Sequence, residues 1–251
     1  MEDHIRIGSA VIFAAVFSVL AFLMNWLTYD GAVSAGIFGT IAYGLGDWPV
    51  ALIVIFFFVS ASLVSKDVAR SEEGYSIRFR RDGTQVWANG FWLALWVLIW
   101  FITDLPLFLV AAVSTIAAAT ADTWATELGS NSETKTYLIT DFKHVKAGTD
   151  GGISIYGTVA ALLGSGMIAV LYWVAFEGAG ISGLILISVA GFIGCLIDSL
   201  LGAKIQGKSV KASFLSNYDS GNITINNNIV NWLSTGASSI LVLIIVLIFK
   251  I

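Results

Sequence analysis

The residues best suited to chemistry in this sequence are four carboxylates beside long apolar segments: Asp122, Glu127, Asp150 and Asp198. Asp122 and Glu127 belong to the stretch ADTWATELGS, which begins where sixteen uncharged residues, 106–121, end. Carboxylates in or near a bilayer are costly, and they usually face a bundle interior, pair with a cation or line a polar pathway. The alternative is that they only mark helix ends among the lipid headgroups. Four such residues in so apolar a chain favour a functional site.

Magnesium is the cofactor that these carboxylates suit, because Mg²⁺ takes hard oxygen ligands, usually one or two carboxylates together with substrate phosphates. The predicted metal ligands are Asp122, Glu127, Asp150 and Asp198. All of them except Asp150 are also the predicted catalytic residues. On a helix, Thr123 and Glu127 share a face adjacent to that of Asp122, so Thr123 joins the predicted phosphate-binding set.

A second cluster, RFRRDGTQVWANG, lies directly before an apolar segment and supplies three arginines, one acid and two amides: Arg78, Arg80, Arg81, Asp82, Gln85 and Asn89. Arginine binds phosphate oxygens through two parallel hydrogen bonds. On charge alone, a basic collar that touches lipid headgroups is the stronger interpretation. Gln85 and Asn89, however, share one helical face, and a collar needs no inward amides. The cluster is therefore a candidate phosphate site.

The glycine-rich stretch GTDGGIS, residues 148–154, precedes another apolar segment and contains Thr149 and Ser154. Glycines that lead into a helix N-terminus form anion sites from backbone N–H groups and the helix dipole. An ordinary interfacial turn, with Ser154 near the helix cap, explains the same residues equally well. Both interpretations stay open, and Thr149 and Ser154 are kept as candidate phosphate ligands.

Other chemistries find little support. The only histidines are His4 and His144 and no Cys/His cluster exists, which disfavours zinc, and neither histidine lies in a motif that would support a serine-hydrolase triad. The stretch GAKIQGKS, residues 202–209, matches the phosphate-loop pattern letter for letter. That pattern works where a strand leads into a helix. Here a membrane span precedes it, so we expect the match to be accidental.

The elements that must position these residues are membrane helices. The chain is 57% hydrophobic and 12% charged, with a mean hydropathy of +0.85, far more apolar than soluble domains. Only two prolines interrupt it, and 25 glycines suit close helix packing in lipid. The single Cys195 excludes an intramolecular disulfide, and the net charge of −4 gives no reason to expect a nucleic-acid partner.

We predict an all-α, polytopic membrane bundle that forms a single transmembrane domain over residues 1–251. The predicted spans are 7–29, 33–46, 48–64, 86–103, 106–121, 153–176, 181–203 and 229–249. The second is short for a span and rich in glycine, so it either crosses or dips in and returns, which makes seven or eight spans. The N-terminus is too short and acidic for a cleaved signal peptide, so the first span is expected to be retained.

Basic residues predict the orientation. Twelve of the thirteen lysines and arginines lie in the N-terminus or in three long loops, 65–85, 122–152 and 204–228. The positive-inside rule places these loops in the cytoplasm, in a cell membrane crossed many times. If segment 33–46 does not cross, Arg6 is cytoplasmic too, which is a slight argument for seven spans.

In this order, four motifs resemble one membrane family: RRDGTQVWANG, ATADTWATELG, GTDGGIS followed by Gly157-Thr158, and DSLLGA with Gln206. That family, long described as a domain of unknown function, includes animal transmembrane protein 19 and the plant chloroplast phytyl-phosphate kinase. The resemblance covers nearly the whole chain. It implies transfer of a phosphoryl group from a nucleoside triphosphate, CTP favoured, to an isoprenyl phosphate, and in prokaryotic and archaeal members the expected acceptors are polyprenyl phosphates.

We therefore expect a magnesium-dependent prenyl-phosphate kinase, with CTP or another triphosphate as co-substrate and the isoprenyl chain among the spans. Lys143 would join the arginines on the phosphates, Gln206 would join the amides that orient them, and Asp150 would lie near the nucleotide. A cytidylyltransferase or alcohol-phosphate transferase is the alternative among enzymes. A carrier or flippase for anionic lipids is the alternative from another class. Membrane lipids are further expected partners. The sequence leaves open whether the chain forms a homo-oligomer.

Overall fold

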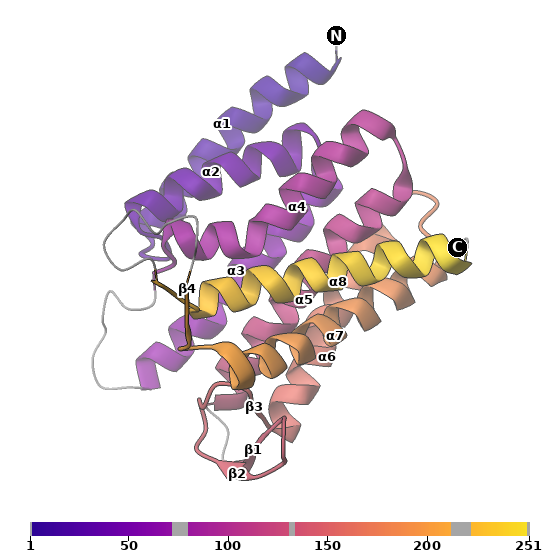
Figure 1. Cartoon of the computed structure of the whole chain (residues 1–251). Coiled ribbons are helices and arrows are strands. Elements are labelled where there is room, and N and C mark those ends of the chain that lie inside the picture. Colours follow the sequence, from indigo (N-terminus) through magenta and orange to yellow (C-terminus); the bar gives the residue numbers. More distant parts are fainter. Residues whose placement is uncertain (1, 72–79, 131–133, 212–221, 250–251) are drawn as a thin grey trace.

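The computed structural model describes residues 2–71, 80–130, 134–211 and 222–249 (Figure 1). These residues form eight helices: α1 (Glu2–Leu23), α2 (Tyr29–Gly44), α3 (Asp47–Ser71), α4 (Gly83–Thr103), α5 (Pro106–Ser130), α6 (Ile155–Ala175), α7 (Ile181–Ile205) and α8 (Asn227–Phe249). Seven of them, all but α2, are long and apolar enough to cross a bilayer. The prediction of an all-α, multi-pass membrane bundle is confirmed.

Helix α2 has 16 residues, about 24 Å at 1.5 Å per residue, which is short for a span. It nevertheless runs antiparallel along α1 rather than dipping in and returning. A Cβ on Gly31, near its start, would lie 2.3 Å from the Arg81 carbonyl oxygen, and one on Gly44, its last residue, would lie 3.4 Å from Ala10. Helix α2 therefore joins the two ends of the bundle.

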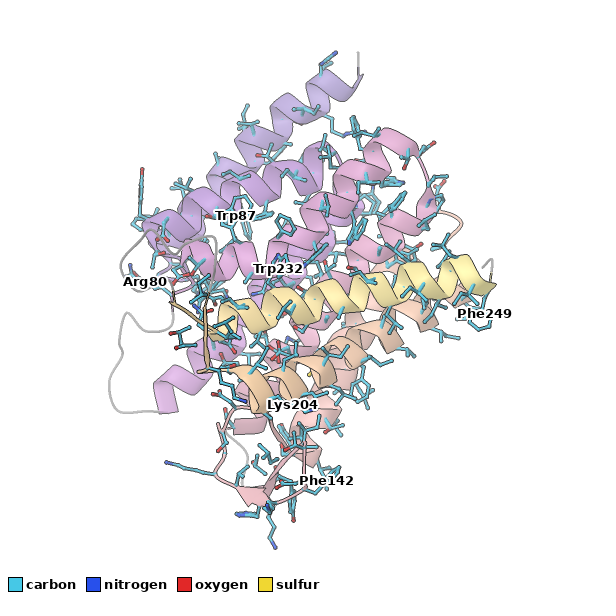
Figure 2. The ribbon with its side chains drawn as sticks, viewed as in Figure 1. Arg80, Trp87, Phe142, Lys204, Trp232 and Phe249 are labelled. Atoms are coloured by element: carbon cyan, nitrogen blue, oxygen red, sulfur yellow. The ribbon has the colours of Figure 1, made fainter. Side chains whose placement is uncertain are left out.

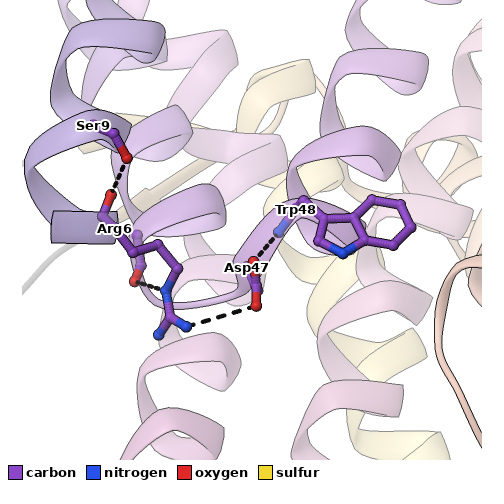
Figure 3. Close-up of polar contacts among 5 residues, drawn as sticks. Arg6, Ser9, Asp47 and Trp48 are labelled. Carbon is purple, nitrogen blue, oxygen red and sulfur yellow. Dashed lines mark hydrogen bonds and ion pairs between the residues drawn. The ribbon is translucent and has the colours of Figure 1, made fainter. Parts of the chain in front are cut away.

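The C-terminal ends of α1, α3, α5 and α7 lie at one end of the bundle, here termed the loop end (Figure 1). Arg80 and the exposed Phe142 lie at this end, whereas Phe249 lies at the other (Figure 2). Arg6 lies at the end opposite the loop end, where its Nη1 is 3.6 Å from Asp47 Oδ2 (Figure 3). Arg6 therefore lies on the cytoplasmic side only if α2 does not cross the bilayer, and the choice between seven and eight spans stays a prediction.

Helix α5 is the centre of the bundle and packs against α3, α4, α6, α7 and α8. Its middle is an unbroken run of buried small residues from Ala117 to Ala121. Glycines of the neighbouring helices meet it closely: a Cβ on Gly191 would lie 2.6 Å from the Ala117 Cβ, and one on Gly194 would lie 2.6 Å from the Ala118 Cβ. Small residues thus bring the helix backbones together, as expected for packing in lipid.

Short strands occupy the connections at the loop end. β1 (Thr136–Leu138) pairs antiparallel with both β2 (His144–Val145) and β3 (Gly152–Ile153), and β4 (Ser209–Lys211) pairs with β5 (Asn222–Thr224). The segment 202–209 therefore runs from the last turn of α7 into β4. A helix followed by a strand is the reverse of a phosphate loop, so the phosphate-loop match is accidental, as predicted.

Candidate functional site

Helices α5 and α7 run in the same direction and bring two of the predicted carboxylates together. The carboxyl groups of Asp122 and Asp198 lie close together and line the same polar space. Asp198 is 7% exposed, and its Oδ2 accepts a hydrogen bond of 2.8 Å from Ser234 Oγ on α8. The amide nitrogen of Asn231, in the orientation that satisfies its neighbours, donates to the same oxygen at 3.1 Å. Two carboxyls in such contact must share a proton or a cation.

One turn further along α5, Glu127 faces Arg81 across a serine of α3. Ser65 Oγ donates to Glu127 Oε1 at 2.7 Å, and Arg81 Nη2 lies 3.4 Å from the same Ser65 oxygen. Arg81 Nη1 donates to Ser62 Oγ at 2.9 Å. Burial lowers the pKa of Arg81 from its usual value, and the Glu127 carboxylate acts in the opposite direction. Because arginine stays protonated in proteins, this is a partly buried cation.

The backbone around Arg81 is fixed by the turn between α1 and α2. Arg81 N donates to the Trp26 carbonyl at 3.0 Å, and Thr28 N donates to the Arg81 carbonyl at 3.1 Å. The next residue, Asp82, caps α4: its Oδ1 accepts from Gln85 N at 2.8 Å, while Gln85 Oε1 accepts from Asp82 N at 3.1 Å. The capping box occupies the Asp82 carboxylate, so Asp82 positions the arginine rather than facing a ligand.

These two pairs line one polar pocket at the loop end. Its lining residues come from the turn before α4 and from α4, α5, α7 and α8: Arg81, Gln85, Asn89, Asp122, Thr123, Thr126, Glu127, Asp198, Asn227, Asn228 and Asn231. One carboxylate pair and one partly buried cation therefore face a common space together with several amides, which suits an anionic ligand bound with a cation.

A second polar pocket adjoins the first and shares Asp122, Thr126, Asp198 and Asn227 with it. Its cavity volume is about 130 Å³, and four predicted residues line it: Thr149, Asp150, Ser154 and Gln206. The glycine-rich turn packs closely on α7, because a Cβ on Gly151 would lie 2.6 Å from the Ser199 carbonyl oxygen. The carboxylate pair thus stands between two connected polar spaces.

Within this second pocket, two side chains already have local partners. Ser154 is the N-cap of α6, and its Oγ accepts from Gly157 N at 3.0 Å. Thr149 Oγ1 donates to the Lys146 carbonyl at 2.7 Å. The cap interpretation of Ser154 therefore holds. It does not exclude contact with an anion, because the remaining N–H groups at a helix start still point outward.

Three predicted phosphate ligands lie elsewhere or outside the structure. Arg80 donates to Asn25 and lines neither polar pocket. Lys143 belongs to the exposed β1–β2 hairpin, where its Nζ is 2.7 Å from Asp141 Oδ2; this contact raises the pKa of Lys143. Arg78 lies outside the described residues. Of the predicted cations that the structure describes, Arg81 alone lines the site.

Within the described residues, no group of three or more histidine, cysteine, aspartate or glutamate side chains is arranged to hold a metal ion. Magnesium often takes only one or two carboxylates from the protein and completes its shell with phosphate and water. The neighbouring carboxylates of Asp122 and Asp198 fit that smaller requirement. Asp150 and Glu127 face the same connected spaces and stay predicted ligands.

Sequence reasoning missed Ser62, Ser65 and Ser234. Each lies within an apolar helix, where serine is common and gives little signal by itself. The spacing of Ser62 and Ser65 by three residues, at the loop end of a span, places them on one helical face and is the only available signal.

Comparison with known proteins finds a matching family model and several similar proteins. The family model described as integral membrane protein DUF92 matches residues 12–239. An uncharacterized membrane protein of Methanocaldococcus jannaschii is 32% identical over 212 residues, which are 84% of this chain and 87% of that protein. Two Arabidopsis thaliana proteins are also similar: protein PGR, 27% identical over 82% of this chain and 81% of its own, and chloroplastic protein VTE6, 26% identical over 88% and 66%. No solved structure matches the chain.

Proposed function

Since the chain belongs to the DUF92 family of integral membrane proteins, we propose that it is a prenyl-phosphate kinase that uses CTP or another nucleoside triphosphate. An oxygen of the prenyl phosphate attacks the γ-phosphorus, the bond from that phosphorus to the β-phosphate oxygen breaks, and prenyl diphosphate and nucleoside diphosphate leave. The motif resemblance to the plant phytyl-phosphate kinase supports this reaction. The observation that carries it here is the convergence of Arg81, Asp122 and Asp198 on one polar pocket.

Phosphoryl transfer depends mainly on positioning and on neutralising charge. Magnesium, held by Asp122 and Asp198, would supply that neutralisation at the phosphates. Arg81 would bind the acceptor phosphate, and Glu127 would keep the guanidinium oriented through Ser65. Asn89, Gln85 and Thr123 line the same space and would orient the phosphate oxygens.

The nucleotide would occupy the second pocket, against the glycine-rich turn and the start of α6. Asp150, Thr149 and Gln206 would contact it there, with the backbone N–H groups of the α6 N-terminus available to its phosphates. The loop end would then face the cytoplasm, where nucleoside triphosphates are found, in agreement with the positive-inside rule.

The test is transfer of label from γ-³²P-CTP to a prenyl monophosphate by purified protein in detergent with Mg²⁺. We expect labelled prenyl diphosphate, no product when EDTA removes the metal, and a loss of roughly 100-fold or more for Asp122→Asn. Asp104→Asn, at the opposite end of the bundle, is the matched control and should keep full activity.

Two results would contradict the proposal. One is unchanged transfer by Asp122→Asn. The other is label in released pyrophosphate, which would indicate cytidylyl transfer instead. The variant must keep the elution profile and melting temperature of the wild-type protein, so that loss of the site is not confused with loss of the fold.

A further inference from the structure

An apolar chamber adjoins the polar pocket on the side away from the glycine-rich turn. It lies between α1, α2, α3, α4 and α5 with a cavity volume of about 140 Å³, and its walls are almost entirely apolar. Six aromatic rings line it: Phe13, Phe17, Phe38, Tyr43, Phe57 and Phe58. Walls of this composition are typical of a site for an apolar ligand.

The chamber has one polar end, formed by Arg81, Gln85 and Asn89, and these three residues also line the polar pocket. A ligand with an anionic head and an apolar chain could therefore place its head at the partly buried Arg81 while its chain continues into the chamber. The boundary between the polar residues and the apolar walls would then coincide with the boundary between the ligand's phosphate and its hydrocarbon chain.

The chamber runs along the bundle axis away from the loop end. On α4 it extends from Gln85 to Leu93, and on α2 from Ala35 to Tyr43. Each interval is eight residues, about 12 Å at 1.5 Å per residue. Ala51, near the start of α3, belongs to the wall farthest from Arg81. The chamber thus has a limited depth, shorter than the hydrocarbon core of a bilayer.

The chamber also reaches the surface of the bundle. Phe13 of α1 and Ile55 of α3 line it and are 64% and 41% exposed. Helix α1 packs mainly on α2 and meets α3 through aromatic rings, such as Phe17 and Phe58 with centroids 5.8 Å apart. In a membrane, this opening between α1 and α3 faces lipid.

We propose that the chamber holds the part of a single prenyl chain nearest its phosphate, and that longer chains pass between α1 and α3 into the bilayer. This inference rests on the proposed function for the identity of the ligand, but not for the existence of the site. It makes α1 and α2, which carry no predicted catalytic residue, the elements that bind the lipid.

The experiment measures binding without nucleotide, so it does not depend on catalysis. A photoreactive farnesyl monophosphate is cross-linked to the protein and competed with geranyl, farnesyl, geranylgeranyl and undecaprenyl monophosphates. Because each buried methylene strengthens binding about fourfold, affinity should rise steeply from geranyl to farnesyl and level off once the chain exceeds the chamber.

The variant Ala51→Phe fills the far end of the chamber. We expect it to weaken the binding of farnesyl phosphate roughly tenfold or more and to leave the binding of geranyl phosphate unchanged. Ala15→Phe, the same change on the exposed face of α1, is the matched control and should bind all four ligands like the wild-type protein.

Cross-links confined to the chamber walls and lost in Ala51→Phe would support the site, even if no kinase activity is found. Cross-links scattered over the bilayer-facing surface, equal weakening by Ala15→Phe, or equal competition by phosphatidic acid would overturn it. Cross-linking to the chamber together with absence of phosphoryl transfer would contradict the proposed kinase function alone.

Discussion

Arg81 is the residue on which the phosphate end of the site depends. Its guanidinium contacts two serines of α3, and its backbone is bonded to the turn between α1 and α2. Lysine keeps the charge but not the planar array of donors. We expect Arg81→Lys to lower the rate of phosphoryl transfer roughly 10- to 100-fold, as for the loss of a hydrogen bond to a charged group.

The matched control is Arg80→Lys, because Arg80 contacts Asn25 and lines neither polar pocket. Its rate should stay close to that of the wild-type protein in the same γ-label assay. If both substitutions reduced transfer equally, the arginines would act as a basic collar at the headgroups, and the specific role of Arg81 would be wrong.

At the scale of single residues, the sequence predicted the acids and Arg81 better than the serines that hydrogen-bond to them. Asp122 and Asp198 are recognisable because a carboxylate in an apolar helix is costly, so its presence is informative. Ser65 and Ser234 complete the site, yet serine is common in membrane helices and costs little energy there, so it gives little signal. Arg80 and Arg81 are adjacent in sequence, and only the backbone pairing with Trp26 and Thr28 decides which one faces the pocket.

At the scale of elements, the packing of α5 against α7 sets the distance between Asp122 and Asp198. Gly191 is one of two points of close approach, since a Cβ there would lie 2.6 Å from Ala117 Cβ and 3.0 Å from Ser165 Cβ. Gly191→Ala must push the helices apart. We expect it to destabilise the protein by about 1–3 kcal/mol, as overpacking usually does.

Gly166→Ala on α6 is the control, because its expected effect on stability is zero or of opposite sign. A Cβ there meets only Ser188 Oγ at 3.9 Å, so the change should be neutral or stabilising by about 0.5–1 kcal/mol through helix propensity. Thermal unfolding of both variants in one detergent measures the difference. A melting temperature for Gly191→Ala at or above that of Gly166→Ala would contradict this account of the packing.

The extent of α5 also shows where sequence reasoning about elements fails. The apolar segment 106–121 predicted a span, but the helix continues to Ser130 and carries both Asp122 and Glu127. Hydropathy ends a span where polar residues begin. It cannot distinguish polar residues that leave the bilayer from polar residues that face a pocket inside the bundle.

At the scale of the whole molecule, the site requires the α1–α2 turn and the three long connections to lie at one end of the bundle. That arrangement follows if α2 crosses, because Tyr29 then lies on the same side as the β1–β2 hairpin. Composition could not decide the matter, since 16 residues rich in glycine fit a crossing or a re-entrant segment.

Cysteine labelling tests this topology. In a Cys195→Ala background, single cysteines replace Tyr29, which is 78% exposed, Phe142 in the hairpin, or Leu105 in the turn between α4 and α5. With a membrane-impermeant maleimide on intact cells, we expect Leu105→Cys to react, and Tyr29→Cys and Phe142→Cys to react only after permeabilisation.

If Tyr29→Cys reacts together with Leu105→Cys, α2 does not cross, and Arg81 loses the turn that positions it. If Tyr29→Cys and Phe142→Cys react in intact cells and Leu105→Cys does not, the crossing holds, but the site faces away from the cytoplasm and its supply of nucleotide.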